Sequence, residues 1–178
     1  MLGLRLVCPT ADLKESYLAA LREFQKEGLP WMVALDIEAI EKKFSAFVEA
    51  ELRKKTFWTK DIPVLESEFW AVVGGEFAGR ISIRHRLNDD LRFMGGHIGY
   101  DTRPSFRGRG VASEMLKQAK PLANAIGISE ALLTCNDDNS ASIRVIEKNG
   151  GVLLERKLQF EGGPMKRYYS LKTCERAD

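Results

Sequence analysis

Residues 95–116 read GGHIGYDTRPSFRGRGVASEML, and this stretch decides the fold. Ile98, Tyr100 and Thr102 alternate at a period of two, which predicts a strand. Pro104 ends the strand because proline has no backbone N–H to donate to a ladder. A Gly-rich turn follows, and apolar residues at helical spacing come directly after it. The stretch therefore predicts a strand, a tight turn and a helix N-terminus in succession.

The turn in this stretch has the chemistry of a phosphate site. Gly108 and Gly110 permit backbone conformations and close approaches that a side chain would prevent. The first amides of the following helix have no acceptor within the helix and lie at the positive end of its dipole, so they attract an anion. Arg107 and Arg109 add charge and paired donors. A solvated surface loop is the plainer alternative.

Two common nucleotide motifs do not match the turn. A nucleotide-triphosphatase P-loop needs Gly-Lys followed by Ser or Thr, and the sequence has no such run here. The dinucleotide fingerprint has a different glycine spacing and no arginine ahead of it. The phosphate expected at this turn therefore belongs to another kind of cofactor.

Length and composition predict an ordinary globular protein. The chain has 178 residues, of which 44% are hydrophobic and 29% charged, so we expect a single domain over residues 1–178. The net charge of +2 does not call for a nucleic-acid partner. No apolar run of membrane length and no signal peptide is present, so we expect no membrane association.

The cysteines and histidines predict a reducing compartment and no metal. Cys8, Cys135 and Cys174 are an odd number without metal-ligand spacing, which is typical of reduced thiols in a cytoplasmic protein. Cys135 lies in an apolar run, so we interpret it as a core residue. His85 and His97 are the only histidines, which excludes a His-rich metal site.

Hydrophobic periodicity predicts the remaining elements. Thr56–Glu68 is interpreted as an irregular segment in which Phe57 and Trp58 pack under helices or line a substrate pocket. Pro121 falls inside a helical pattern, which predicts a kink or an early end near Lys120. The expected strands are 2–7, 69–73, 77–86, 92–102, 131–135, 152–154 and 167–171, and the expected helices are 13–24, 36–55, 111–126 and 140–148.

This order predicts a mixed sheet with helices on both faces. The segment 131–135 is a short apolar run between turn signals, which is consistent with a buried strand parallel to its neighbour. The connection through the helix after Gly110 would then be a crossover between two parallel strands.

Several motifs together resemble the GNAT family of N-acetyltransferases. The pattern Arg-x-x-Gly-x-Ala that begins at Arg107 resembles the family's acyl-CoA pyrophosphate loop. Residues 139–151, an Asn-led helix that ends in Glu-Lys-Asn-Gly, resemble its second cofactor motif. His97–Tyr100 with Arg103–Ser105 resembles a bacterial branch of predicted acetyltransferases. The resemblance covers nearly the whole chain and implies a mostly antiparallel sheet with a central parallel splay.

The resemblance also implies a cofactor, acetyl-CoA, and residues that bind it. In the family, the strand before the loop pairs with pantetheine, the loop holds the diphosphate, and an Asn touches the CoA arm. The matching positions are Tyr100, Asp101 and Thr102 on the strand, Arg107, Gly108, Arg109, Gly110, Val111 and Ala112 in the loop, and Asn139.

The family's usual acid and base cannot be carried over. Where many members have a tyrosine as general acid this chain has Ile146, and where a carboxylate base is frequent it has Thr134. His97, Tyr168 and Tyr169 are the substitutes that we name as catalytic candidates, although His97 is equally well explained as a structural histidine. Further candidates are the carboxylates Asp101 and Glu68, a contact of Arg84 and His85 with an acidic part of the substrate, and catalysis by positioning alone.

Two functions therefore compete. The first is an acetyl-CoA-dependent N-acetyltransferase that acts on a small amine or a protein amino group, and the second is a GNAT-fold module that binds acyl-CoA without chemistry. A nucleic-acid binder is a poorer third reading because stacking aromatics are scarce among the basic residues. Glu38, Glu41, Glu49 and Glu51 are interpreted as a solvated helix face, so the acceptor amine is not identified. An exposed edge strand could pair two copies into a homodimer.

Overall fold

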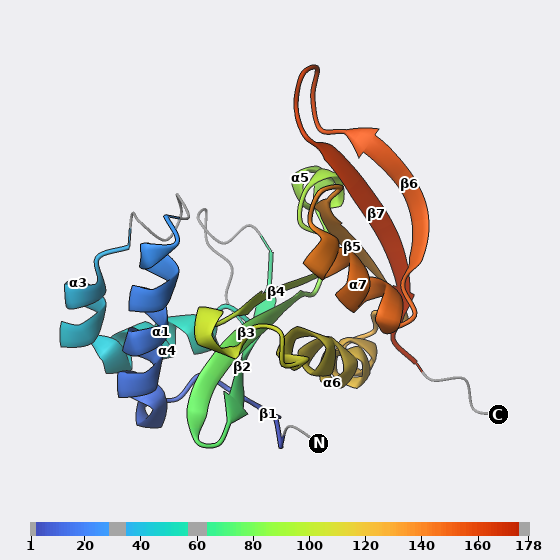
Figure 1. The fold of residues 1–178 in the computed structure, drawn as a ribbon. Coiled ribbons are helices and arrows are strands. Elements are labelled where there is room, and N and C mark those ends of the chain that lie inside the picture. Colours follow the sequence, from blue (N-terminus) through green and yellow to red (C-terminus); the bar gives the residue numbers. More distant parts are fainter. Residues whose placement is uncertain (1–2, 29–34, 57–63, 175–178) are drawn as a thin grey trace.

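The computed structural model describes residues 3–28, 35–56 and 64–174 (Figure 1). The predicted positions Leu2, Phe57 and Trp58 lie outside this part of the chain. The strands are β1 (Arg5–Val7), β2 (Glu66–Val73), β3 (Glu76–Arg84), β4 (Ile98–Thr102), β5 (Glu130–Asn136), β6 (Val152–Leu158) and β7 (Met165–Lys172). The helices are α1 (Lys14–Lys26), α3 (Ile37–Lys42), α4 (Phe44–Arg53), α5 (Asp89–Phe93), α6 (Val111–Ala125) and α7 (Ser140–Lys148), with single 3₁₀ turns η1 (Ala11–Leu13) and η2 (Pro104–Phe106).

The strands form two antiparallel sheets, in the orders β1-β2-β3-β4 and β5-β7-β6. An isolated bridge between Gly96 and Leu133 joins the sheets, and the His97 amide donates to the Leu132 carbonyl at 2.7 Å. A Cβ on Gly96 would lie 2.3 Å from that carbonyl oxygen, so the junction needs glycine. The predicted mixed α/β fold is confirmed. The buried strand at β5 is also confirmed, but its ladder partner is β7, which runs antiparallel to it.

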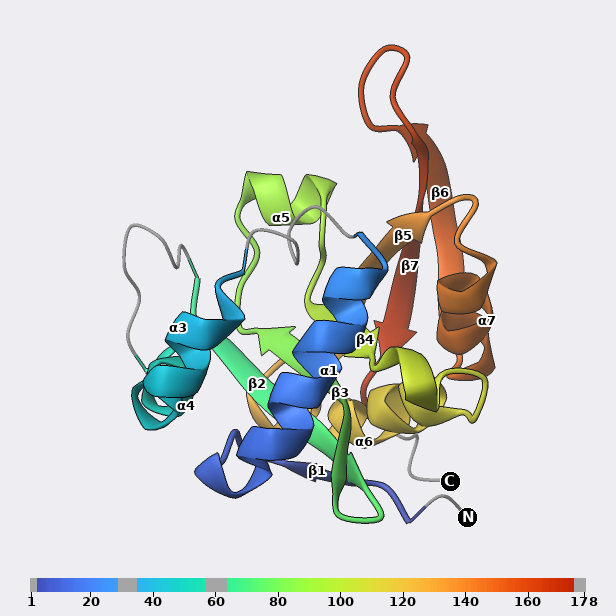
Figure 2. The same cartoon turned by 60° about the vertical axis from the view of Figure 1, so that its left-hand side comes forward.

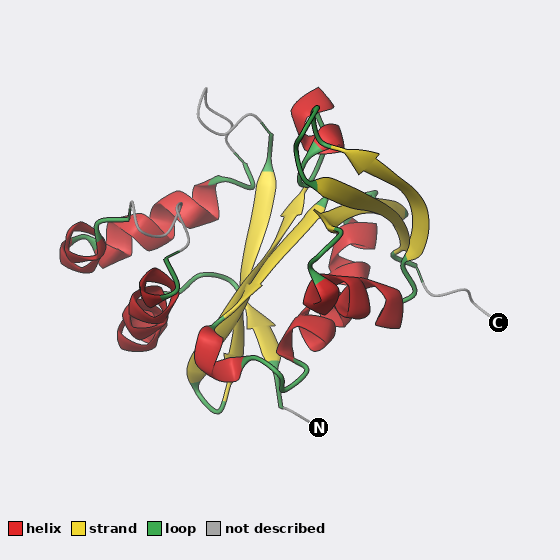
Figure 3. Ribbon diagram, turned by 45° about the horizontal axis from the view of Figure 1, so that its top comes forward, coloured by secondary structure: helices red, strands yellow, loops and turns green. Residues whose placement is uncertain are grey.

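Helices cover both faces of the first sheet (Figure 3). Alternation along β3 places Ile81 and Ile83 against α6, where Met115 and Leu116 are fully buried. On the opposite face α1 crosses the sheet with α3 and α4 beside it (Figure 2). A second core lies there, in which the Tyr17 and Trp70 rings stack with centroids 4.4 Å apart.

Three local expectations differ from the structure. The helix predicted from residue 36 is broken at Lys43 into α3 and α4. Residues 92–93, predicted as strand, belong to α5, because the Asn88 side chain caps that helix at the Leu91 amide, 2.9 Å away. Pro121 lies inside α6, which continues to Ala125, so of the two alternatives near Lys120 the early end is wrong. Ala119 and Ala123, buried on either side of the proline, pack the helix against the core on both sides of it.

Candidate active site

Two neighbouring cavities along β4 share lining residues, and together they are called the groove. The outer part, about 640 Å³, lies between the end of β4, the Gly-rich loop and the N-terminus of α7. The inner part, about 470 Å³, lies between β3, β4, β5 and α7. Tyr100, Asp101 and Ser142 line both parts, so a long ligand could extend from one into the other.

The Gly-rich loop opens the outer part of the groove. Gly108 and Gly110 have φ angles of 74° and 81°, in the left-handed region that a side chain disfavours. Gly110 is the N-cap of α6, so the unpaired first amides of that helix follow it directly. Of the loop residues predicted to bind cofactor, Arg107, Gly108, Gly110, Val111 and Ala112 line the outer part.

The two arginines of the loop differ in what holds them. The Arg107 side chain donates to the Thr102 carbonyl at 3.2 Å, and its Nη2 donates to Glu27 at 2.8 Å. The Arg109 guanidinium lies over the Phe106 ring, 5.4 Å from its centroid. Phe106 is contacted in the same way by Arg103 at 5.5 Å. Arg107 is therefore held at the end of α1, whereas Arg109 is positioned by an aromatic ring.

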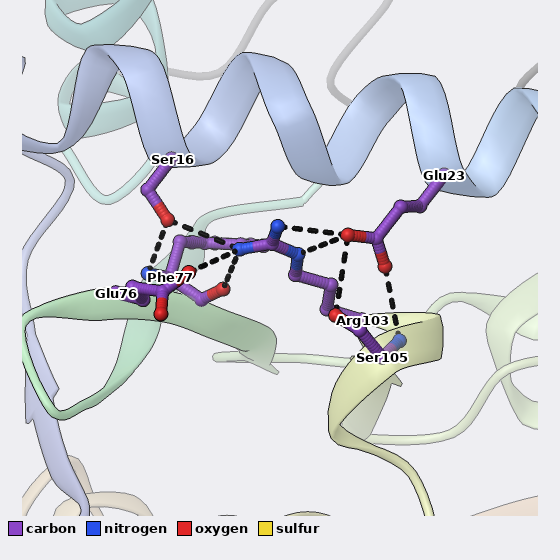
Figure 4. A network of polar contacts seen from close by, with 6 residues as sticks. All are labelled: Ser16, Glu23, Glu76, Phe77, Arg103 and Ser105. Carbon is purple, nitrogen blue, oxygen red and sulfur yellow. Dashed lines mark hydrogen bonds and ion pairs between the residues drawn. The ribbon is translucent and has the colours of Figure 1, made fainter.

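Arg103 links the start of the loop to α1 (Figure 4). Its side chain is 9% exposed, and its Nη2 forms an ion pair with Glu23 of α1 at 2.7 Å. Nη1 donates to Ser16 Oγ and to the Phe77 carbonyl, each at 3.2 Å. The Ser105 amide donates to Glu23 at 2.9 Å. One guanidinium thereby joins α1, β3 and the turn that precedes the Gly-rich loop.

The electrostatics of Glu23 reflect this network. Burial alone would raise the pKa of this carboxyl, but hydrogen bonds from Arg103 and Ser105 hold the pKa below its ordinary value. The ionised carboxylate is therefore the form that the folded protein favours.

The opposite wall of the groove is the N-terminus of α7. The Asn139 side chain caps this helix and accepts a hydrogen bond from the Ser142 amide at 3.0 Å. The Tyr100 hydroxyl donates to the Ser142 carbonyl at 3.5 Å, and burial raises the pKa of Tyr100 to about 12. Asn139, Tyr100, Asp101 and Thr102 all line the outer part, so these predicted cofactor residues lie together with the loop.

The three catalytic candidates lie elsewhere. His97 Nδ1 accepts a hydrogen bond from the Leu132 amide at 2.9 Å, and burial, Arg92 and Arg84 lower the pKa of its ring. The Tyr168 hydroxyl donates to the Phe93 carbonyl at 2.7 Å, and the Tyr169 hydroxyl donates to Glu147 at 3.0 Å. Burial raises the pKa of both phenols. Among the described residues that line the groove, none is one of these three.

Arg80, Ser82 and Arg84 of β3 line the inner part. Arg84 was a predicted substrate contact, whereas His85, named with it, is not among the lining residues. Arg80 Nε donates to Asp101 at 3.0 Å, and Arg80 Nη1 lies 3.4 Å from Glu68. Burial lowers the pKa of Arg80, but these two carboxylates outweigh it and raise the pKa. Ile146 and Thr134, at the family's usual acid and base positions, line the same part.

Glu51 was expected on the solvated face of its helix, and this prediction is wrong. Its side chain is 11% exposed and pairs with Lys54 at 2.6 Å. Burial and the nearby Glu68 raise the pKa of the Glu51 carboxyl. The helix turns this residue toward the sheet, whereas Glu38 and Glu49 are exposed as expected.

Metal sites, membrane-spanning helices and disulfides were also sought among the described residues. They hold no cluster of three or more His, Cys, Asp or Glu side chains suited to a metal ion. None of their helices combines the length and apolarity needed to cross a membrane. Cys135 is buried, Cys8 and Cys174 are exposed, and all three are free thiols.

Comparisons with known proteins agree with this geometry. A family model described as "Acetyltransferase (GNAT) domain" matches residues 2–152. A search of curated protein sequences gave no match.

Three solved structures share the fold. The microcin C7 self-immunity acetyltransferase MccE, in complex with acetyl-CoA and AMP, superposes with a TM-score of 0.67 at 13% identity, covering 95% of this chain and 92% of that one. The Salmonella typhimurium acetyltransferase that modifies the N-terminal serine of ribosomal protein L7/L12 superposes with a TM-score of 0.64 at 18% identity. The match covers 95% of this chain and 94% of that one. The putative acetyltransferase YncA of Salmonella typhimurium, with acetyl-CoA, gives 0.62 at 15% identity, covering 99% and 96%.

Proposed function

We propose that this chain, which belongs to the GNAT acetyltransferase family, transfers an acetyl group from acetyl-CoA to a primary amine of a small molecule or a protein. The observation that carries the proposal is the left-handed turn at Gly108 and Gly110, which opens α6 onto a groove along β4. The solved structures of MccE and YncA hold acetyl-CoA, which supports the same co-substrate here.

The residues around the groove fit acetyl-CoA. The first amides of α6 would bind the diphosphate, with Arg107 and Arg109 as neighbouring cations. The amide chain of pantetheine resembles a strand, so it could extend along β4 toward the inner part. The cofactor residues that we propose are Tyr100, Asp101, Thr102, Arg107, Gly108, Arg109, Gly110, Val111, Ala112 and Asn139.

The proposed reaction is direct attack of a neutral amine on the thioester. The amine nitrogen bonds to the acetyl carbon, the C–S bond breaks, and the sulfur leaves as a thiolate that takes a proton. Backbone amides of β4 near Tyr100 would stabilise the charge on the carbonyl oxygen. Asp101 lines both parts of the groove, so it is the best-placed carboxylate to accept the amine's proton, while alignment of the two reactants lowers the barrier further.

A second function, acyl-CoA binding without chemistry, is favoured by one observation. His97, Tyr168 and Tyr169 lie outside the groove lining, so the side chains first named for acid–base chemistry are not beside a bound thioester. The two functions share the cofactor site and differ only in turnover. Release of CoA thiol with an amine acceptor distinguishes them.

The test is calorimetric titration with acetyl-CoA, with CoA and free ATP as further ligands. Gly110→Asp should abolish acetyl-CoA binding because it places a negative charge against the diphosphate, and Arg107→Ala should weaken it. Gly162→Asp is the matched control, since Gly162 also has a positive φ, 75°, but lies in the β6–β7 turn. Equal binding by the Gly110→Asp and wild-type proteins would contradict the proposed site.

Domain organisation, location and oligomeric state are proposals of the same kind. We infer a single domain over residues 1–178 and no nucleic-acid partner, since the net charge is +2. The free thiols support a reducing, cytoplasmic location. We also infer a homodimer, because β6 is an edge strand on which every residue is exposed.

A further inference from the structure

The inner part of the groove has charges at two separate places. At one place Arg80 and Asp101 line the wall and form an ion pair. Arg80 also pairs with Glu68, which does not line the cavity, so the three side chains together carry one negative charge in excess. Arg84 also lines this part and is balanced by Glu66 at 3.1 Å. Counted with their partners Glu68 and Glu66, which do not line the cavity, the charged groups of the β3–β4 side sum to one negative charge, and Asp101 is the carboxylate among them that lines the cavity.

Lys166 on β7 supplies the opposite charge. The residue is only 9% exposed, and its Nζ donates to Asn136 Oδ1 at 3.0 Å. No carboxylate of the described residues lies within ion-pair distance of this ammonium, and the residue opposite it on β6 is another lysine, Lys157. Lys166 is a largely buried residue that lines the cavity, and a neutral amide oxygen compensates its ammonium less well than an anion would.

Lys166 lines the same cavity as Asp101, Thr134 and Gly99. The cavity therefore has an acidic group at β3–β4, where the acetyl group is expected, and an unbalanced cation on the β5–β7 side. A molecule with an ammonium and a carboxylate would match both charges. A plain alkylamine or polyamine would leave Lys166 without an anion.

We infer that the acceptor amine is zwitterionic: its amine lies beside Asp101 and its carboxylate is bound by Lys166. This inference rests on the proposed function and narrows its acceptor to amino acids and short peptides, both of which offer the required chemistry. Lys166 is thereby a specificity residue, since its partner is the substrate's anionic group.

A binding experiment tests this without knowledge of the natural acceptor. The lysines of the CoA-saturated protein are labelled with ¹³C-methyl groups, and the Lys166 resonance is assigned by its loss in Lys166→Arg. N-acetylglycine, a product-like carboxylate, should shift this resonance, whereas the neutral N-acetylglycinamide should not. The Lys120 resonance is the internal control, because this half-buried lysine donates to the Asn149 carbonyl outside the groove and should not move. No shift with the carboxylate, or equal shifts with both probes, would overturn the inference.

Turnover gives an independent readout. Free amino acids and dipeptides are compared with their C-terminal amides in CoA-release assays. We expect Lys166→Met to lower kcat/KM at least tenfold for the carboxylates, to leave the amides unchanged, and to leave the acetyl-CoA Kd unchanged. Better turnover of the amides would overturn the inference while the proposed function stands. Loss of acetyl-CoA binding by the wild type would instead be a failure of the proposed function.

Discussion

Arg103 anchors the Gly-rich loop through a buried network of polar contacts. Its buried guanidinium is shared between Glu23 of α1, the Phe77 carbonyl of β3 and Ser16. Removal of one partner from a buried ion pair leaves the other without compensation, which is more costly than the net stabilisation of the pair itself. The loop is therefore anchored by a contact far from it in sequence.

We predict that Arg103→Met lowers the free energy of unfolding by about 3 kcal/mol. It should also weaken acetyl-CoA binding, because Ser105 and the loop lose their anchor at Glu23. Urea unfolding and calorimetry measure the two effects. Arg22→Met is the control: Arg22 pairs with Glu41 in a largely exposed contact, 53% and 41% exposed, so its loss should cost less than about 1 kcal/mol. Equal losses from the two variants would contradict the role of the network.

Glu23 predicts a pH dependence of stability. Its pKa in the folded protein lies below the ordinary value of 4.5, so folding favours the ionised carboxylate. The resulting stabilisation is complete above the unfolded pKa and is lost as pH falls through the folded pKa. Between about pH 5 and 3, Glu23→Gln should therefore lose less stability than the wild type, as measured by urea unfolding at each pH. Glu38→Gln, at an exposed position, should show the same dependence of unfolding free energy on pH as the wild type. If Glu23→Gln shows it too, Glu23 is not the source of this pH dependence.

At the scale of single residues, the sequence predicted backbone conformation more successfully than it predicted side-chain burial. The positive φ angles at Gly108 and Gly110 follow from local turn chemistry, and both were predicted. The burial of Glu51 and Lys166 depends on which elements pack over them, and no local pattern carries that information. Asp101 and Arg84, which line the groove, were named from the sequence, whereas Lys166, which also lines it, was missed.

At the scale of elements, periodicity located nearly every helix and strand in the described part of the chain. Prediction from periodicity failed where a helix cap or tertiary packing determined the structure instead of the local pattern. Asn88 begins a helix where strand was expected, and α6 continues past Pro121. Tertiary contacts on both sides of the proline compensate for the backbone hydrogen bond that it cannot form.

The proline in α6 gives a prediction at this scale. Pro121 is exposed and inside the helix, so Pro121→Ala restores a backbone donor without disturbing the core. We expect the free energy of unfolding to rise by about 1–3 kcal/mol, with a higher Tm in a thermal melt. Pro104→Ala is the matched control, because Pro104 begins η2, where proline is favoured, and its replacement should give no gain. A Pro121→Ala variant that melts at or below the wild-type temperature would show that the helix is adapted to the proline.

At the scale of the whole molecule, the order of elements predicted the mixed α/β fold but not the separation into two sheets. The two sheets are joined at the close approach of Gly96 to Leu132, which no periodicity predicts. The second sheet ends in β6, whose outer edge is free within the described part of the chain. Val152, Leu154 and Leu158 on this strand are 64%, 60% and 50% exposed, an apolar edge that favours pairing with another strand.

The charges along β6 match those of a second, antiparallel copy of the strand, which predicts the register of the proposed homodimer. When two copies pair antiparallel about Arg156, Glu155 lies opposite Lys157 of the second copy, twice in each dimer. Arg156 then lies opposite Arg156 of the second copy. Each of these arginines already pairs with Asp137 of its own chain at 2.6 Å, which compensates its charge. Opposite charges across antiparallel strands stabilise the pair and like charges destabilise it.

Glu155→Lys and Lys157→Glu should each weaken the proposed homodimer by about tenfold or more, because each makes both cross-strand pairs repulsive. A mixture of the two variants restores opposite charges at both pairs, so heterodimers should form where neither variant dimerises alone. Sedimentation velocity of the wild type, each variant and the mixture measures this. Glu38→Lys, an exposed charge reversal on α3, should leave the dimer intact. Dimers in both single variants, or no recovery in the mixture, would contradict this register, because only the predicted pairing brings residues 155 and 157 of two copies together.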